Sequence, residues 1–183
     1  MDASYLTDTH FATHPAGVTE TLALDDLAQP WHLDGRTWFT RWRCPSNGPD
    51  HVVASPNGAW AATSLEGLYG LWPGWVPEEE CELLDLEGAV RWLRGESLAT
   101  PHSSLLDVWN WADDVARGLN RPVVPRNRRD DAVYDKLFFS TIPWLERRGD
   151  YVARWTPRQH TRLRTRTAST LGFLRLVVAG QAG

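Results

Sequence analysis

Cysteine, lysine and long apolar runs are scarce in this chain. Cys44 and Cys81 are its two cysteines, too few for a disulfide framework, and both are expected to be reduced thiols. No apolar run approaches the roughly 18 residues that a membrane-spanning helix needs. The first residues also lack the basic and apolar regions of a signal peptide. These absences predict a soluble, cytoplasmic protein.

The basic residues are almost all arginine. Of 19 basic residues only Lys136 is a lysine, and the formal net charge is −4. The codon usage of a GC-rich bacterial genome explains such a skew, so the number of arginines is weak support for a binding site. The net negative charge argues against the general electrostatic footprint of a nucleic-acid-binding protein.

Known catalytic signatures are also missing. The sequence has no GxSxG, GxxxxGK, GxGxxG, HExxH or CxxC pattern. His10 and His14 are suitably spaced for a helix face, but no cysteine or further histidine lies nearby to complete a metal site. Neighbouring carboxylates such as Asp113 and Asp114 do not face each other on a helix. No cofactor or metal site is predicted, although a carboxylate pair drawn from separate elements, as in a glycosidase, would escape this search.

Tryptophan, in contrast, is abundant. The chain has 11 tryptophans among 183 residues. Indole rings are large, and they are enriched at the energetic centres of protein interfaces. One core of this size does not easily hold them all, so some are expected at a surface, in a cleft or beneath a partner.

Residues 15–85 have the pattern of short strands joined by turns. Trp38–Cys44 alternates between two faces and predicts a strand, and Val18–Leu24 is a second candidate. Asn57-Gly58, after a proline and between two β-rich runs, predicts a hairpin. Two further short strands are predicted at Leu68–Trp72 and Cys81–Leu84.

Residues 86–180 have helical periodicity. Helices are predicted at Leu86–Arg94, Ser103–Leu119 and Asp130–Ile142 and from Thr156 onward, where Thr156-Pro157-Arg158-Gln159 forms a capping box. The predicted fold is therefore α+β, with an N-terminal antiparallel meander followed by three to four helices that pack on one face. A single domain is expected over residues 1–183, with a mobile arm at residues 1–14.

The helix at Ser103–Leu119 carries the candidate binding site. Its apolar stripe is Leu105, Val108, Trp109, Ala112, Val115 and Leu119. Asp107, Asn110, Asp114 and Gly118 are expected to point away from the core, with Trp111 at the edge of that face. An indole flanked by carboxylates has the composition of an interface anchor with an acidic rim. The alternative is that Trp111 packs beneath the loop at residues 120–129.

The tryptophans of the meander and the arginines of the last helix are two further candidate sites. If the interface lies elsewhere, the tryptophans of the meander, Trp60, Trp72 and Trp75, are the second candidates. Arg158, Arg162 and Arg166 are four residues apart and form one stripe on the last helix. Nucleic-acid binding is one interpretation of that stripe. The negative net charge favours a solvated, partly ion-paired face instead.

Three segments carry a resemblance. LLDVWNWADDVARGL, AVYDKLFFSTIPWL and YVARWTPRQHTRLR together resemble a group of small bacterial proteins associated with toxin–immunity loci, over residues 104–180. The resemblance implies a protein that binds a cognate toxin and blocks it, and it assigns a role to no individual residue. The first hundred residues carry no such resemblance.

The leading hypothesis is a non-enzymatic, protein-binding inhibitor, an immunity protein that occludes the active site of a cognate toxin. Its predicted partner-binding residues are Asp107, Trp111, Asp114, Trp60, Trp72 and Trp75. One alternative is an enzyme with a tryptophan-lined cleft that acts on a carbohydrate or another flat ligand. A second is an accessory subunit of a larger assembly. The expected partner is a protein, and neither a nucleic acid nor a membrane.

Overall fold

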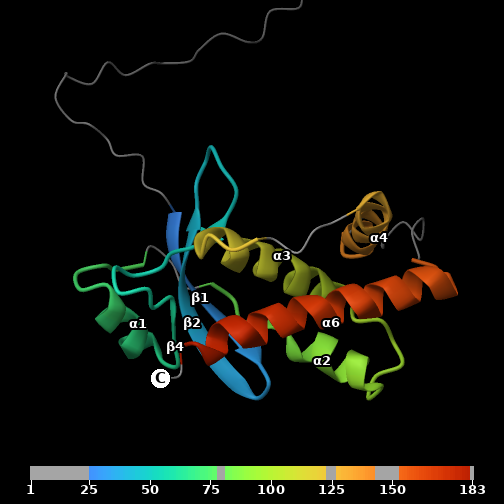
Figure 1. Cartoon of the computed structure of the whole chain (residues 1–183), viewed down its shortest axis with the longest axis horizontal. Helices are drawn as coiled ribbons and strands as arrows, with labels where there is room; N and C mark the ends of the chain where they lie inside the picture. The colour runs from blue at the N-terminus through green and yellow to red at the C-terminus, as the bar shows by residue number, and fades with distance from the viewer. Residues whose placement is uncertain (1–24, 78–80, 123–126, 143–152, 182–183) are drawn as a thin grey trace, which may run out of the picture.

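The computed structural model describes residues 25–77, 81–122, 127–142 and 153–181 (Figure 1). Strands occupy the first half of the chain and helices dominate the second, so the predicted α+β class is confirmed. The expected arm at residues 1–14 and the strand at Val18–Leu24 lie outside the described residues. The elements in chain order are β1 (Asp25–Leu33), β2 (Arg36–Cys44), β3 (His51–Val52), β4 (Ala61–Ala62), α1 (Leu65–Leu71), β5 (Leu84–Asp85), α2 (Glu87–Arg94), α3 (His102–Gly118), α4 (Arg128–Phe139) and α6 (Pro157–Ala179).

Strands β1 and β2 form the centre of the sheet. They are joined by Asp34 and Gly35, which both have positive φ (52° and 73°), as a two-residue hairpin turn requires. The strand order is β3-β2-β1-β5. β5 pairs with β1 in parallel, so the prediction of a purely antiparallel meander is wrong at this edge. The reason is that β5 follows a long connection containing α1 rather than a tight turn.

The predicted hairpin around Asn57-Gly58 forms only its turn. The Ser55 amide donates to the Ala59 carbonyl oxygen (2.7 Å), and Gly58 takes a φ of 84°. The flanking strands β3 and β4 do not pair with each other, however, because both pair antiparallel with β2. They are two parts of one edge strand, separated by the turn.

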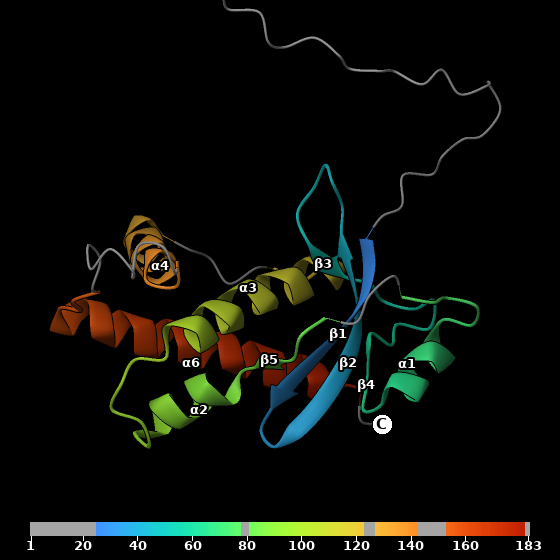
Figure 2. The same ribbon diagram turned by 180° about the vertical axis from the view of Figure 1, so that it is seen from behind.

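Helix α1 replaces the strand predicted at Leu68–Trp72. Ser64 caps its first turn, where its hydroxyl oxygen accepts a hydrogen bond from the Gly67 amide (3.0 Å). Leu68 and Trp72 then pack against Ala28 of β1. Helices α2, α3, α4 and α6, which follow the meander, contribute to a separate cluster on the opposite face of the sheet, so the prediction that these helices pack on one face is confirmed (Figure 2).

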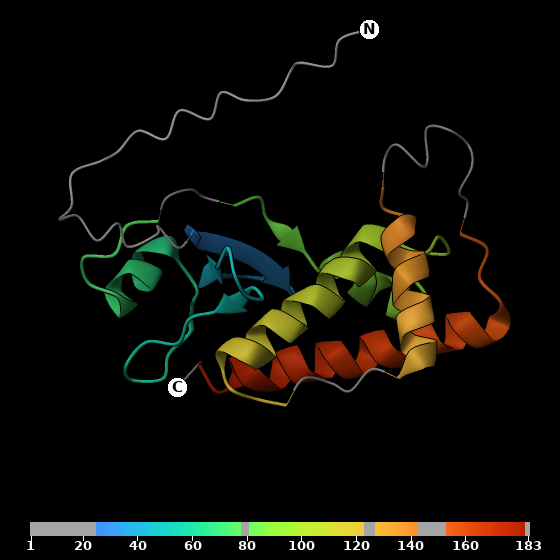
Figure 3. The same ribbon diagram turned by 90° about the horizontal axis from the view of Figure 1, so that it is seen from above.

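The main core lies between the sheet and helices α2, α3 and α6. α3 runs alongside α6, while α4 crosses α6 near its N-terminal end (Figure 3). The predicted apolar stripe of α3 is buried, except that Leu119 is partly buried. The capping box of Thr156 and Gln159 at the start of α6 is confirmed. α4 begins earlier than expected: Asn127 is its N-cap, and Asp130 completes a capping box with it.

The two cysteines are thiols rather than a disulfide, as predicted. Burial raises the pKa of the Cys44 thiol to about 12, and the Asp50 carboxylate adds to that rise. Cys44 is therefore a protonated, poorly nucleophilic thiol at neutral pH.

Candidate functional site

Four aspartates surround one open cavity between the sheet, α3 and α4. The cavity has a volume of about 440 Å³ and is lined by Asp50, Asp107, Asp113 and Asp114. We call it the acidic pocket. Its other lining residues are Gln29, Trp42, Leu84, Asn110, Trp111, Arg117 and Tyr134. The volume lies within the range typical of sites for small molecules or single side chains.

Three predicted site residues, Asp107, Trp111 and Asp114, come together in the acidic pocket. The predicted exposure of Trp111 and Asp114 is wrong, because Trp111 is only 2% exposed and Asp114 only 7%, whereas Asp107 is partly exposed. The polar side of α3 is itself covered. The ring of Trp111 lies against those of Trp31 and Trp42, with centroids 5.8 and 6.4 Å apart. Trp111 thus packs against the sheet, while the loop at residues 120–129, the predicted alternative, lies partly outside the described residues.

The C-terminal end of α3 is also covered, at Gly118. The residue is expected to face away from the core, yet a side chain there would overlap the carbonyl oxygen of Val52. α3 therefore approaches β3 closely enough that only glycine fits. The close approach keeps the loop after β2 beside α3, where the Arg117 guanidinium donates to the Asp50 carbonyl oxygen (2.9 Å).

Asp114 is the most strongly connected carboxylate of the acidic pocket. The Trp42 indole donates to it (Nε1–Oδ2, 3.2 Å), and Arg117 forms an ion pair with it one turn along α3. Burial raises the pKa of Asp114 to about 7, Arg117 opposes that rise, and the Asp50 carboxylate adds to it. Asp114 therefore changes its protonation state close to neutral pH.

Asp107 lies about two turns before Asp114 on α3. Burial raises its pKa to about 6. No salt bridge to Asp107 occurs within the described ranges 25–77, 81–122, 127–142 and 153–181. An ionised Asp107 is therefore a partly desolvated charge without a counter-ion in that part of the chain.

Aromatic and amide groups complete the wall of the acidic pocket. The Tyr134 hydroxyl donates to Asn110 Oδ1 (2.9 Å), which joins α4 to α3. The Trp111 indole N–H is buried and has no acceptor among the residues that the structure describes. An unsatisfied buried donor costs about 1–3 kcal/mol. The site therefore offers carboxylate acceptors and aromatic surface in one place.

The tryptophans of the meander lie elsewhere. Trp60 is 1% exposed and stacks on Trp31 with centroids 5.9 Å apart. Trp72, the C-cap residue of α1, is 8% exposed and packs in the cluster with Leu68 and Ala28. The expectation that these two indoles are exposed for a partner is wrong, because Trp60 is buried on one face of the sheet and Trp72 on the other. Trp75 is half-buried, and the Arg41 guanidinium lies 5.1 Å from its ring centre.

Several residues of the acidic pocket carry no signal in the sequence. Asp50 belongs to a loop and Gln29 to β1, and only the packing of β3 and β5 brings them beside α3. Asp113 and Asp114 both line the pocket although neighbouring carboxylates on a helix diverge. Side chains that point in different directions from a helix can line the same cavity, and a helical projection of the sequence does not show this.

Neither the geometry of the described residues nor comparison with known proteins assigns a class to the acidic pocket. Within the described part of the chain, no three histidine, cysteine, aspartate or glutamate side chains are placed to hold a metal ion. None of the described helices combines the length and the apolar character needed to cross a membrane. No family model, curated protein or solved structure matches the chain.

The raised pKa of Asp107 predicts an inverted pH dependence of stability. Folded Asp107 holds its proton up to a pH of about 6, whereas the ordinary pKa is 3.8, so this group stabilises the fold at low pH and loses that effect as the pH rises through 6. Asp107→Asn is expected to raise the free energy of unfolding at about pH 8 by about 1–3 kcal/mol relative to the unmodified chain.

Denaturant unfolding of both proteins at several pH values measures this difference. The gap between variant and unmodified chain should shrink as the pH falls below about 6 and close below about 3.8, where Asp107 is protonated in both the folded and the unfolded chain. Glu66→Gln, an exposed position on α1, is the matched control and should produce no such trend. A gap that does not change with pH would show that the folded and unfolded chains hold this proton equally well.

Proposed function

We propose that the protein is a non-enzymatic inhibitor of a partner protein, an immunity protein that neutralises a cognate toxin. Its acidic pocket would receive a cationic side chain of that partner. One observation carries the proposal: Asp107 and Asp114 line the same open cavity, and burial raises the pKa of both toward neutrality. The ionised form of a desolvated carboxylate is stabilised more by a nearby cation than that of a solvated carboxylate is.

Arginine is the partner side chain that the acidic pocket suits best. A guanidinium binds a carboxylate through two parallel hydrogen bonds and also stacks on aromatic rings. The pocket supplies carboxylates at Asp107 and Asp114, with the rings of Trp42 and Tyr134 in the same wall. A buried charge of this kind gives both affinity and selection of the correct partner.

Further support comes from the sequence. The negative net charge favours a basic partner, and no known catalytic pattern is present. Helices α4 and α6 and all but the first two residues of α3 lie within the segment that resembles proteins of toxin–immunity loci, and α3 contributes most of the acidic pocket. The resemblance and the site therefore fall in the same part of the chain.

A second candidate function is an enzyme acting on a carbohydrate. The observation in its favour is that Asp114, with a pKa of about 7, holds an exchangeable proton beside aromatic rings, as a general acid does. Turnover of chromogenic glycosides that is lost in Asp114→Asn would favour this enzyme over the inhibitor.

Affinity capture from the native host tests the inhibitor. The baits are the unmodified chain, the double variant Asp107→Asn/Asp114→Asn and the control Glu66→Gln, which removes one exposed charge on the opposite side of the sheet. We expect one protein to be captured by the unmodified chain and the control, to be lost with the double variant, and to be inhibited when bound. Equal capture by all three baits would show that the acidic pocket is not part of the interface.

A further inference from the structure

A second cavity lies where the N-terminal parts of α4 and α6 approach each other (Figure 3). Its volume is about 800 Å³. Arg128 and Arg129 line it from the first turn of α4, and Arg158 and Arg162 line it from the start of α6. We call this cavity the arginine pocket. It shares no lining residue with the acidic pocket.

Most of the positive charge of the arginine pocket has no counter-ion within the part of the chain that the structure describes. Arg128, Arg129 and Arg158 are exposed and form no ion pair with any residue in the described ranges. Arg162 pairs with Asp130 at 2.8 Å. Burial raises the pKa of Asp130, but hydrogen bonds from Arg162 and the Asn127 backbone outweigh it and hold that pKa below its ordinary value. Asp130 thus neutralises Arg162, whereas Arg128, Arg129 and Arg158 have no such partner among the described residues.

Arginines elsewhere in the fold commonly have partners of their own. Asp26 pairs with Arg43 at 2.9 Å, and Asp34 pairs with Arg175 at 2.6 Å. The arginine pocket differs from these places because it gathers like charges from two helices around an open space. Such an arrangement is self-repelling until an anion occupies it.

Both helices add to the positive potential. The N-terminal end of a helix carries a partial positive charge, and α4 and α6 present these ends to the same cavity. Ala132, Val133 and Pro157 add apolar groups to the wall, which Gln159 and Thr161 complete. The cavity thus combines an anion-binding side with an apolar side.

We infer that the arginine pocket binds a small ligand that carries two or more phosphoryl groups, of the nucleoside diphosphate or triphosphate type. Guanidinium forks match phosphate oxygens through paired hydrogen bonds, and two helices supplying two arginines each suit a ligand with more than one phosphoryl group. The apolar wall suits the non-phosphate part of such a ligand. This site is independent of the proposed inhibitor function.

A nucleic-acid strand fits the surface less well. The stripe of arginines expected along α6 does not continue as an exposed surface, because Arg166 is 7% exposed and lies 5.7 Å from the ring centre of Trp109. Arg164 donates to the Trp92 carbonyl oxygen (3.1 Å) and so faces α2. Arg128, Arg129 and Arg158 converge on one cavity instead of following a track.

Isothermal titration of the full chain with sodium pyrophosphate tests the inference, with ADP and ATP as further ligands. We expect saturable binding of pyrophosphate at one site. Arg129→Gln and Arg158→Gln should each weaken it about tenfold or more, the usual effect of losing a charge-assisted hydrogen bond. Arg91→Gln removes the same charge from an exposed position on α2 and should leave binding unchanged. Tighter binding of ADP than of pyrophosphate would identify the nucleotide as the source of the phosphoryl groups.

Three results would overturn the inference. These are no binding of pyrophosphate, ADP or ATP, an equal loss of affinity in Arg91→Gln, and binding of a single-stranded oligonucleotide without binding of pyrophosphate. Thermal unfolding of each variant checks that it is folded, which is expected because the three substituted side chains are exposed.

Discussion

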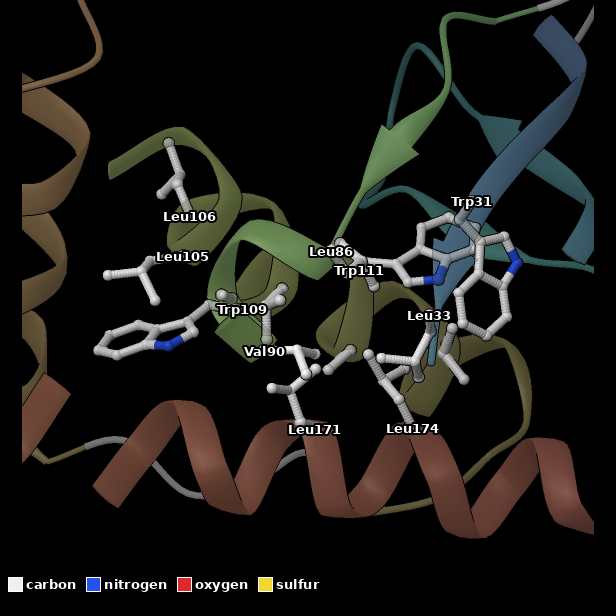
Figure 4. Close-up of a cluster of buried hydrophobic side chains, with 14 of the residues drawn as sticks. Trp31, Leu33, Leu86, Val90, Leu105, Leu106, Trp109, Trp111, Leu171 and Leu174 are labelled. Carbon is white, nitrogen blue, oxygen red and sulfur yellow. The ribbon is translucent and has the colours of Figure 1, made fainter. Parts of the chain in front are cut away.

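Replacing Trp111 by alanine is expected to lower the free energy of unfolding by about 3–5 kcal/mol, the usual cost of emptying a large buried site. Trp111 lies beside Trp31 at the sheet end of the core cluster (Figure 4). Its ring also lies against that of Trp42. The substitution therefore removes packing between α3 and the sheet. Denaturant unfolding measures the loss. A loss below about 1 kcal/mol, as at surface positions, would restore the earlier interpretation of Trp111 as an exposed anchor.

Trp111→Phe separates the packing of the ring from its polar atom. The Trp111 indole N–H has no acceptor within the described part of the chain, so phenylalanine removes an unsatisfied donor and retains an aromatic ring. Trp111→Phe is thus expected to cost much less stability than Trp111→Ala.

Trp109→Ala is expected to cost about 5 kcal/mol, the upper end of the range for tryptophan in a core. Trp109 lies at the end of the cluster away from the sheet (Figure 4). Its indole donates to Thr167 Oγ1 at 3.0 Å, and both side chains are buried. Losing the ring therefore opens a cavity and leaves the Thr167 hydroxyl without this donor.

The phenylalanine variants make the comparison specific. Trp109→Phe should cost more than Trp111→Phe, because only Trp109 has a hydrogen bond to lose. Denaturant unfolding of the four variants measures both differences. Equal costs for the two phenylalanine variants would show that the bond to Thr167 does not stabilise the fold.

The helical half of the fold follows from local signals. The apolar stripe of α3, the capping box at Thr156 and the stop at Gly95, which takes a φ of 79°, are all encoded within a few residues of where they act. α1 was missed as a helix because its seven residues also fit a short strand. Its apolar positions Leu65, Leu68 and Trp72 fit a helical repeat once the Ser64 cap is recognised.

The sheet and the site depend on contacts between distant segments. Nothing near His51 or Ala61 indicates that both strands pair with β2, and nothing near Leu84 indicates a parallel partner. The sequence does place Asp107, Trp111 and Asp114 on neighbouring turns of one helix, which the structure retains. Their burial was not predictable, because the helix pattern does not show that β3 and α4 cover the polar side of α3.

The central claim is that ionised Asp107 and Asp114 receive a cation from a partner protein. The most direct test is the dissociation constant of the captured partner, measured for the unmodified chain and Asp107→Asn at about pH 5.5 and 8. The unmodified chain should bind about tenfold or more tightly at the higher pH, since a cation favours the ionised carboxylates, and Asp107→Asn should show a smaller change. Affinity that is the same for both proteins at both pH values would contradict the account.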